Sequence, residues 1–236
     1  MFLRGIAVVN IGVSIALLFI LVNIQFEHDI ALRRQEKELA ELRIDIMISQ
    51  IRPHFLYNVL TGIRKLCETN PKQAAESISA FSRFLRTNMA SLTDKNPIPF
   101  EQELKHTQAY LYLEQQRFGD KLHVVYEIAS VHFSVPPLTL QPIAENAVRH
   151  GLMKKENGGT LTICSGENEN DFFITVADDG AGASEEQLRA EDGTHIGIAN
   201  VRNRLQALCG GSLEIQSEPD KGTTVTIHIP KEGGIQ

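Results

Sequence analysis

The sequence predicts an α + α/β protein with four consecutive parts: an N-terminal transmembrane helix, a coiled-coil stalk, a helical-hairpin dimerisation domain and a C-terminal α/β sandwich. Three observations support this prediction. An uncharged apolar run opens the chain, two amphipathic helical runs follow, and strand patterns alternate with helices after residue 119. The 236 residues have room for one large domain or two modest ones, so two domains behind a membrane helix fit the length.

Residues 1–26 are predicted to hold the transmembrane helix, with its span at residues 5–26. This span carries no charge, and at about 1.5 Å per residue it can cross a hydrocarbon core of roughly 30 Å. A signal peptide is the alternative, but its apolar region is shorter and ends in a small-residue cleavage site. Basic residues follow the span closely: Arg33, Arg34, Lys37 and Arg43. We therefore expect a single-pass protein of the cell membrane with cytoplasmic C-terminal domains.

Residues 27–48 are predicted to form a short parallel coiled-coil stalk. Apolar residues recur there at heptad spacing with charged residues between them: Leu32, Leu39, Leu42 and Ile46. Gln35 and Ser49 occupy the remaining seam positions. An amphipathic helix packed on the protein's own core is the alternative.

Residues 49–118 are predicted to form the dimerisation domain. One helical run ends at Glu68, the segment Thr69-Asn70-Pro71 breaks it, and a second run follows. A further helix is expected from Phe100 to Phe118. Two amphipathic helices joined by a tight turn cannot bury both apolar faces alone, so we expect a second copy to complete a four-helix bundle.

The first of these helices contains the unusual segment Pro53-His54-Phe55-Leu56-Tyr57-Asn58. Inside a helix, a proline removes one hydrogen bond and clashes with the preceding turn, at a cost of about 3 kcal/mol. A kink there would tilt His54 away from the bundle, and Asn58, one turn later, lies on the same face. Alternatively, Pro53 marks a helix start and His54 is an ordinary surface residue.

Residues 119–236 are predicted to form the α/β sandwich, a mixed sheet with helices on one face. The expected strands are 122–128, 160–164, 172–177, 212–216 and 223–229. The expected helices are 138–150 and 196–208.

Several segments of this domain carry candidate ligand groups. Asn146 and His150 lie four residues apart, where a carboxamide oxygen can bind Mg²⁺ and an imidazole can reach a phosphate. Both can equally be solvated surface residues. Asp178 ends a strand and begins D-D-G-A-G, whose glycines allow close backbone approach to a flat ligand. A buried carboxylate there can accept a hydrogen bond from the exocyclic amine of adenine.

Two further segments fit phosphate binding. The loop Gly193–Gly197 opens a helix whose amide N–H groups and dipole attract anions. Gly222-Thr223-Thr224 leads into the last strand. Neither a P-loop nor a dinucleotide-binding glycine motif occurs in the sequence.

The order and spacing of these segments resemble the LytS-type sensor histidine kinases over roughly residues 45–230. The matching segments are P-H-F-x-x-N, E-N-A-x-x-H-G, D-D-G-A-G, G-x-x-I-G-I-x-N-V-R-x-R-L and G-T-T. The resemblance implies that residues 49–118 also serve histidine phosphotransfer, with His54 phosphorylated. It implies that residues 119–236 form a GHKL/Bergerat-type ATP-binding catalytic domain, a fold shared with gyrase, heat-shock chaperone and mismatch-repair ATPases.

The resemblance also implies ATP and Mg²⁺ as cofactors and assigns residue roles. Asn146 would bind Mg²⁺ and Asp178 would read adenine. The remaining nucleotide-binding residues would be His150, Gly180, Gly182, Gly193, Gly197, Asn200, Gly222, Thr223 and Thr224. Asn58 is the candidate for a phosphatase role. Phe55 follows His54 where a carboxylate could have been a base, so Glu145 is a candidate base and the assignment stays open.

The implied partners are a second copy of the chain and a cytoplasmic response regulator, whose aspartate would receive the phosphoryl group. The resemblance suggests a regulator with a LytTR DNA-binding domain. The chain has 23 Lys and Arg against 29 Asp and Glu, a net charge of −6, which argues against direct nucleic-acid binding. The three cysteines (Cys67, Cys164 and Cys209) show no metal-ligand spacing and indicate free thiols in a reducing compartment.

Three residues depart from the family pattern, and His195 among them supports an alternative to the active kinase. His195 replaces the central glycine of G-x-G-x-G, and Arg52 and Tyr57 replace the usual Asn and Phe. A degenerate kinase, binding ATP or a regulator without autophosphorylation, is one alternative. A GHKL-type conformational ATPase is the other, although it would need neither the span nor the P-H-F segment. The sequence leaves open the stimulus, the regulator, cis or trans transfer, and whether the chain is a fragment of a longer receptor.

The coiled-coil prediction can be tested with engineered cysteines. Leu39→Cys and Leu42→Cys are expected to give disulfide-linked dimers on mild oxidation, because seam residues of parallel helices face each other. Gel electrophoresis without reductant measures the product. A cysteine at the flanking position Glu38 is the control, and monomers from all three variants would refute the stalk.

Overall fold

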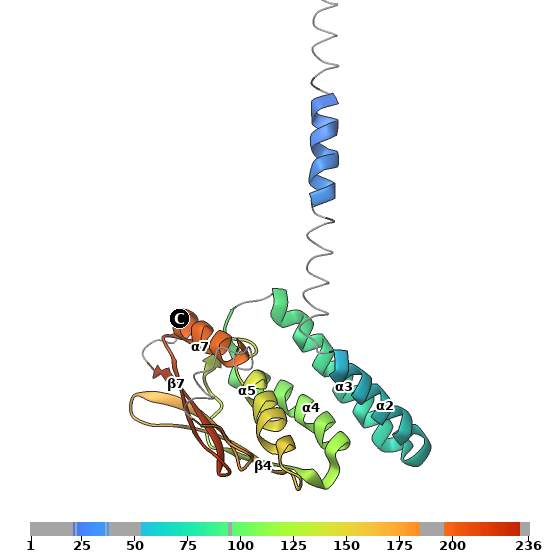
Figure 1. The fold of residues 1–236 in the computed structure, drawn as a ribbon. Helices are drawn as coiled ribbons and strands as arrows, with labels where there is room; N and C mark the ends of the chain where they lie inside the picture. The colour runs from blue at the N-terminus through green and yellow to red at the C-terminus, as the bar shows by residue number, and fades with distance from the viewer. Residues whose placement is uncertain are drawn as a thin grey trace, which may run out of the picture. The chain divides into compact units, whose positions relative to one another are not determined.

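The structure, a computed structural model, describes residues 21, 23–35, 37, 53–93, 96–184 and 196–231 (Figure 1). It divides into two compact units, Met1–Pro53 and His54–Gln236. In the first unit, residues 23–35 are helical. No helix within the described ranges has the length and apolar character needed to cross a membrane. Most of the predicted span at 5–26 and the stalk beyond Lys37 lie outside those ranges.

The second unit begins with a helical hairpin, as predicted. Helices α2 (Pro53–Thr69) and α3 (Pro71–Thr93) lie side by side and are joined at Asn70 (Figure 1). The Asn70 side-chain oxygen accepts a hydrogen bond from the Gln73 amide at 3.2 Å, which caps the start of α3. Pro71 occupies the first helical position, where its missing N–H costs nothing. The predicted break at this turn is therefore confirmed.

Helix α4 (Phe100–Phe118) has the predicted bounds and packs against α3, α5 and β2. An aromatic cluster joins it to the hairpin, with ring centroids 5.0 Å apart for Phe55 and Phe84 and 5.4 Å apart for Phe55 and Tyr110. At the start of α4, Phe100 stacks on Phe133 at 4.7 Å, and Phe133 stacks on Phe172 of the sheet at 4.8 Å. Helix α4 thus packs on both sides of the predicted domain boundary at residues 118 and 119.

The C-terminal part contains a five-stranded mixed sheet, as predicted. Its order is β2-β4-β5-β7-β6, with β2 and β4 parallel and the other neighbours antiparallel. The strands are β2 (Leu122–Ile128), β4 (Gly159–Glu167), β5 (Asp171–Asp178), β6 (Ser212–Glu218) and β7 (Gly222–Pro230). A small antiparallel pair, β1 (Ile98–Pro99) with β3 (Ser134–Val135), was not expected from the sequence.

The core lies between this sheet and its helices. Alternate residues of the central strands are buried, for example Leu161 and Ile163 on β4 and Ile174 and Val176 on β5. Helices α4, α5 (Gln141–Asn146) and α7 (Ile196–Cys209) lie on one side of the sheet (Figure 1). The predicted arrangement of a mixed sheet with helices packed on it is confirmed.

The predicted helix 138–150 was wrong at its start, whereas helical structure continues through Gly151, close to its predicted end. Leu138 has φ +57°, a left-handed conformation that an α-helix excludes, and α5 begins only at Gln141. The buried Glu103 carboxylate fixes this start by accepting hydrogen bonds from the amides of Leu138 (3.1 Å) and Leu140 (2.9 Å). After Asn146 the chain widens into a π-helical turn, Ala147–Gly151, followed by a 3₁₀ turn, Leu152–Lys154.

Candidate functional site

The predicted adenine reader, Asp178, is a buried carboxylate at the end of β5 and is 7% exposed. Its Oδ1 accepts a hydrogen bond from the Gly180 amide at 2.9 Å. Burial raises the pKa of Asp178 to about 6, against the lowering effect of the Gly180 and Thr223 amides. A buried acceptor with this pKa is ionised at neutral pH and can bind a hydrogen-bond donor.

Glycines make room for this carboxylate. A Cβ on Gly151 would overlap Asp178 Oδ1, and one on Gly180 would overlap the Gly151 backbone. Gly222 has φ +102° and lies directly against the Asp178 carbonyl. Gly182, with φ +62°, approaches the Glu218 carbonyl in the same way. The structure therefore brings together glycines from the segments that the sequence singled out, and it adds Gly151, which had been assigned no role.

Polar contacts fix the loop that follows Asp178. The Ser217 hydroxyl accepts from the Ala183 amide at 2.8 Å and lies 2.8 Å from the Thr223 hydroxyl. The Lys155 ammonium donates to the Asp179 carbonyl. Thr224 pairs with Ala177 across the β5–β7 ladder. Ser217 and Lys155 were missed by sequence reasoning, because no local motif connects them to the D-D-G-A-G segment.

Asn146, the predicted Mg²⁺ ligand, lies beside the start of α7. A Cβ built on Gly197 would lie 4.0 Å from Asn146 Nδ2 and 3.9 Å from the Pro142 Cβ. The first turn of a helix and the Asn146 carboxamide are thus neighbours, which suits a phosphate chelated to a cation. Asn200 is exposed on α7, and His150 is half-buried on the π-helical turn.

Two of the predicted residues in the loop before α7 lie outside the described ranges. They are Gly193 and His195. Among the residues that are described, no group of three or more His, Cys, Asp or Glu side chains is placed to bind a metal ion.

His54 and Asn58 lie one turn apart on the exposed side of α2, as predicted. The Asn58 carboxamide donates to His54 Nδ1 at 3.1 Å. His54 is exposed and Asn58 is half-buried, so solvent and ligands reach the imidazole. The predicted kink concerns the turn before Pro53, which lies outside the described residues.

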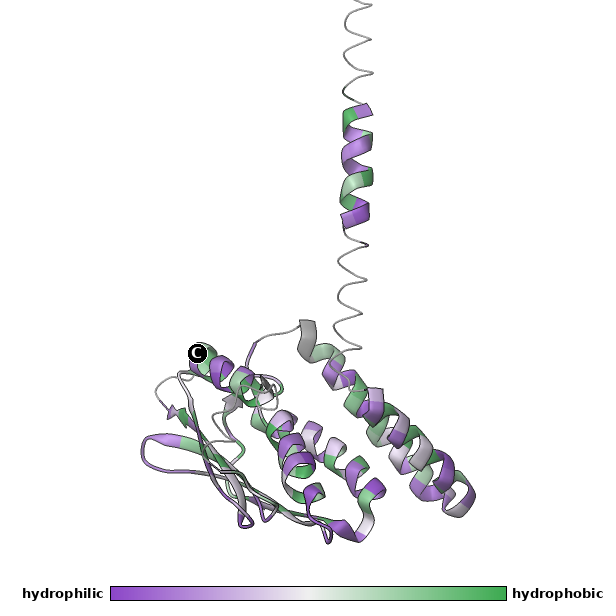
Figure 2. Cartoon of the chain, in the orientation of Figure 1, coloured by the Kyte–Doolittle hydropathy of each residue, from purple (hydrophilic) through white to green (hydrophobic). Residues whose placement is uncertain are grey.

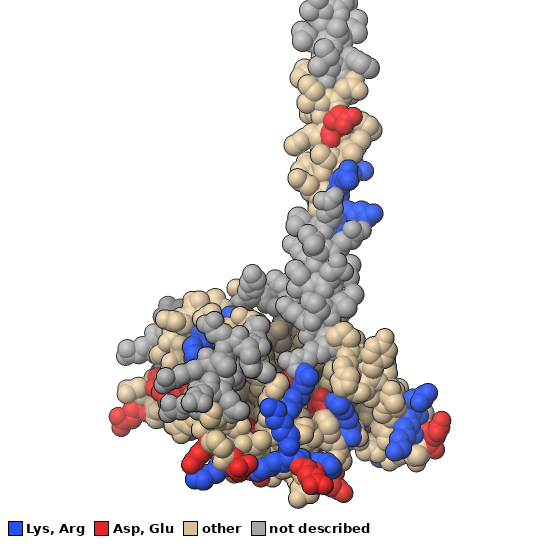
Figure 3. Space-filling model, in the orientation of Figure 1, with Lys and Arg blue, Asp and Glu red and all other residues tan. Residues whose placement is uncertain are grey.

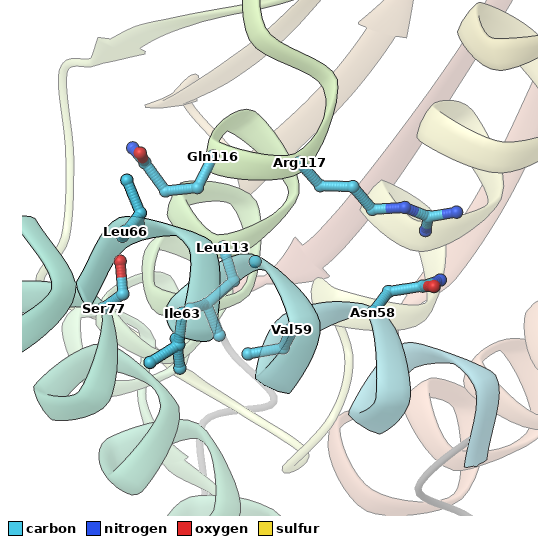
Figure 4. A pocket seen from close by; sticks show the side chains of 9 residues that line it. Asn58, Val59, Ile63, Leu66, Ser77, Leu113, Gln116 and Arg117 are labelled. Atoms are coloured by element: carbon cyan, nitrogen blue, oxygen red, sulfur yellow. The ribbon is translucent and has the colours of Figure 1, made fainter. Parts of the chain in front are cut away.

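Asn58 also lines a small open pocket between the hairpin and α4. The walls are mainly apolar, formed by Val59, Ile63 and Leu113. Figure 4 shows the Asn58 side chain from α2 and the Arg117 side chain from α4 extending in the same direction at one end of this pocket. Arg117 was not singled out by the sequence.

The candidate base Glu145 lies on α5 and forms an ion pair with Arg149 at 3.8 Å. It also lies close to Glu114 of α4. Burial raises the pKa of Glu114, and the negative charge of Glu145 raises it further, partly opposed by Arg117. Glu145 therefore lies on the side of α5 that approaches α4, but its role as a base stays a prediction.

The surface charge is mixed on the face shown in Figure 3. Acidic and basic side chains of the described residues are interspersed there, without a purely basic area.

Comparison with known proteins assigns the family. Residues 42–122 match the family described as Histidine kinase, and residues 138–233 match the family described as Histidine kinase-, DNA gyrase B-, and HSP90-like ATPase. The first match covers the hairpin and α4, and the second covers α5, α7 and four strands of the five-stranded sheet. The chain belongs to the LytS-type histidine kinases.

Three relatives show this relationship. The uncharacterized protein YwpD of Bacillus subtilis (strain 168) is 33% identical over 213 residues, covering 87% of this chain and 77% of that protein. The sensor histidine kinase YpdA of Escherichia coli (strain K12) is 38% identical, covering 84% of this chain and 36% of that protein. The sensor protein LytS of Bacillus anthracis is 36% identical, covering 85% of this chain and 36% of that protein. The chain thus spans about a third of the length of these two sensor proteins.

The glycine packing around Asp178 can be tested by stability. Gly180→Ala is expected to lower the free energy of unfolding by about 1–3 kcal/mol, because its Cβ has no space beside Gly151 and Asp178. Urea unfolding followed by circular dichroism measures the change. Gly62→Ala is the matched control: it lies in a helix with nothing within 4 Å of its Cβ and is expected to stabilise slightly. Equal stabilities for the two variants would contradict the packing.

Proposed function

We propose that the chain is a membrane-bound sensor histidine kinase that autophosphorylates His54 from Mg²⁺-ATP and transfers the phosphoryl group to an aspartate of a response regulator. The supporting observation is that one structural unit combines an exposed, hydrogen-bonded histidine with a buried acceptor in a glycine-lined turn. The family matches cover both of these parts.

In this proposal the nucleotide occupies the space around Asp178, Asn146 and the start of α7. The Asp178 carboxylate accepts a hydrogen bond from the adenine amine, Gly180 and Gly182 shape the base pocket, and Thr223 or Thr224 lies near the base. The phosphates lie near Gly193–Gly197, His150 and Asn200, and Asn146 is the protein ligand of Mg²⁺. The proximity of Gly197 to Asn146 supports this arrangement, since it joins a helix start to a cation ligand.

The reaction needs positioning and charge neutralisation more than covalent help. Neutral imidazole is a sufficient nucleophile near pH 7. Its ring nitrogen attacks the γ-phosphorus, the P–N bond forms, and the bond to the bridging oxygen breaks with its electron pair leaving on ADP. If the carboxamide turns over, its oxygen accepts from Nδ1–H, and this tautomer leaves the Nε2 lone pair free to attack.

A second copy of the chain is the proposed dimer partner. Tyr57 and Leu60 on α2 are 73% and 53% exposed, and Ile78 and Met89 on α3 are 48% and 50% exposed. Figure 2 shows apolar residues along both helices of the hairpin. Large apolar side chains left in water on two adjacent helices favour a four-helix bundle with a partner hairpin.

The remaining assignments are part of the same proposal. The span at residues 5–26 would anchor the chain in the cell membrane, with the stalk and catalytic parts in the cytoplasm. The response regulator would be a soluble protein, and the family resemblance favours one with a LytTR DNA-binding domain. Asn58 is also the residue we propose for any phosphatase activity, because it is one turn from His54 and can orient a water molecule.

The phosphoacceptor and the nucleotide site can be separated by mutation. His54→Gln is expected to abolish autophosphorylation and leave nucleotide affinity unchanged, because the nucleotide does not need the imidazole. Asn146→Ala is expected to weaken Mg²⁺-ATP binding and lose the label as well. The measurement is incubation of the full chain, in detergent or nanodiscs, with γ-labelled ATP and Mg²⁺. An acid-labile, alkali-stable label is expected only in the wild type; full labelling of His54→Gln would refute the site.

The Asp178 pKa predicts a pH dependence. The ionised carboxylate is the better hydrogen-bond acceptor, so nucleotide affinity is expected to be constant above pH 7 and to fall as the pH drops through about 6. If only the ionised form binds, affinity falls about tenfold for each pH unit below the pKa. Titration with a fluorescent ATP analogue measures it. Asp178→Asn should bind weakly with no step near this pH, and a flat wild-type profile between pH 5 and 7.5 would contradict the role.

A further inference from the structure

Arg117 lies near the C-terminal end of α4, on the pocket that Asn58 lines from α2. Asn58 donates to the His54 ring, so this end of the pocket is one helical turn from the phosphoacceptor. In Figure 4 the two side chains extend the same way at this end. Among the residues that line the pocket, Arg117 is the only one with a positive charge.

The Arg117 guanidinium is held in place by its neighbours but keeps hydrogen-bond donors that they do not use. It lies 4.4 Å from the centroid of the Phe118 ring and 3.5 Å from a carboxylate oxygen of Glu114, and the side chain is 32% exposed. A guanidinium has five N–H donors, so an ion pair at this distance leaves several donors for another anion. Stacking on the ring restricts the planar group without consuming those donors.

The carboxylate partner of Arg117 is held by a single contact at 3.5 Å. Glu114 is 2% exposed, and burial raises its pKa, with the charge of Glu145 on α5 acting in the same direction. Helix α4 thus carries a buried acid facing α5 and a half-exposed cation on the pocket beside α2. The two groups lie between the helix of Asn146 and the turn of His54.

Transfer of the phosphoryl group to His54 adds negative charge to the imidazole. Its neighbour Asn58 is uncharged and can stabilise that charge only through hydrogen bonds. A phosphoryl group carries close to two negative charges at neutral pH. An arginine binds it strongly because its guanidinium can donate two parallel, charge-assisted hydrogen bonds to the phosphoryl oxygens. The described residues that line this pocket supply such a cation only at Arg117.

We propose that Arg117 is a phosphoryl-binding residue, whose guanidinium neutralises the group as it moves from ATP to His54 and after it has bonded to the imidazole. The proposal rests on the proposed function. In the step, the P–N bond forms as the bond to the β–γ bridging oxygen breaks; ADP takes the electron pair and the imidazole proton passes to solvent. Arg117 stays protonated throughout and contributes charge and hydrogen bonds.

A purely structural role predicts something different. If Arg117 only paired with Glu114, its loss would leave a buried carboxylate unpaired and lower stability, without separating phosphorylation from nucleotide binding. The phosphoryl-binding role predicts a large loss in the phosphorylation rate at saturating ATP with unchanged nucleotide affinity. The two roles are therefore distinguished by measuring both the phosphorylation rate of His54 at saturating ATP and the dissociation constant for ATP.

The experiment compares Arg117→Gln and Arg117→Lys with Arg64→Gln, which removes an exposed arginine of α2 that does not line the pocket. The full chain is labelled from γ-labelled ATP and, separately, from phosphoramidate, a small phosphoryl donor that needs no nucleotide site. Arg117→Gln is expected to phosphorylate His54 about a hundredfold more slowly at saturating ATP. Arg117→Lys should lose less, because it keeps the charge but not the planar fork. Arg64→Gln should match the wild type.

The outcomes separate this proposal from the proposed function. Wild-type rates in Arg117→Gln with both donors would overturn the role of Arg117 and leave the kinase assignment intact. No ATP-dependent label in the wild type would refute the kinase assignment, and the phosphoramidate rates would then still decide Arg117. If Arg117→Gln fails to fold by circular dichroism, Arg117→Lys decides: a wild-type rate at weakened nucleotide affinity overturns the proposal, and a reduced rate at unchanged affinity supports it.

Discussion

The buried carboxylate of Glu103 is the interaction on which the rest of the structure depends. Glu103 is fully buried on α4, and this burial raises its pKa. Its carboxylate accepts hydrogen bonds from the backbone amides of Leu138 and Leu140, just before α5. Arg204 of α7 donates to the Leu138 carbonyl at 2.6 Å. One acid thus ties together the helix that packs on the hairpin and the two helices of the candidate nucleotide site. An unpaired carboxylate at that depth would cost several kcal/mol, so these amides must stay in place.

A second buried acid, Asp178, shapes the opposite side of the site. Its surroundings have no room for side chains, so glycines from three separate segments meet around it. Gly151 ends the π-helical turn, Gly180 follows the acid and Gly222 begins β7. Because each glycine is needed for the protein's own packing, the turn holds its shape before any ligand arrives, which is what a rigid base pocket requires.

Helix α4 connects these two sites to the hairpin. Its aromatic contacts hold α2 and α3, its start stacks on the sheet through Phe133, and its C-terminal end carries the Glu114–Arg117 pair. A helix that packs on both sides cannot move relative to one without disturbing the other. A change in the hairpin would therefore reach the nucleotide helices through α4, which suits a protein whose family acts in signalling.

Local sequence patterns determined much of the fold and some of the site. The turn at Asn70, the bounds of α4, the five strands of the mixed sheet and the His54–Asn58 contact followed from nearest-neighbour chemistry: a cap before a proline, period-two burial and spacing by one helical turn. Tertiary structure decided what depends on residues far apart. The start of α5 is set by Glu103, 35 residues before Leu138, and the packing role of Gly151 by Asp178. Local sequence gives Arg117 no more than a surface charge, because only the packing of α4 beside α2 places it on the pocket that Asn58 lines.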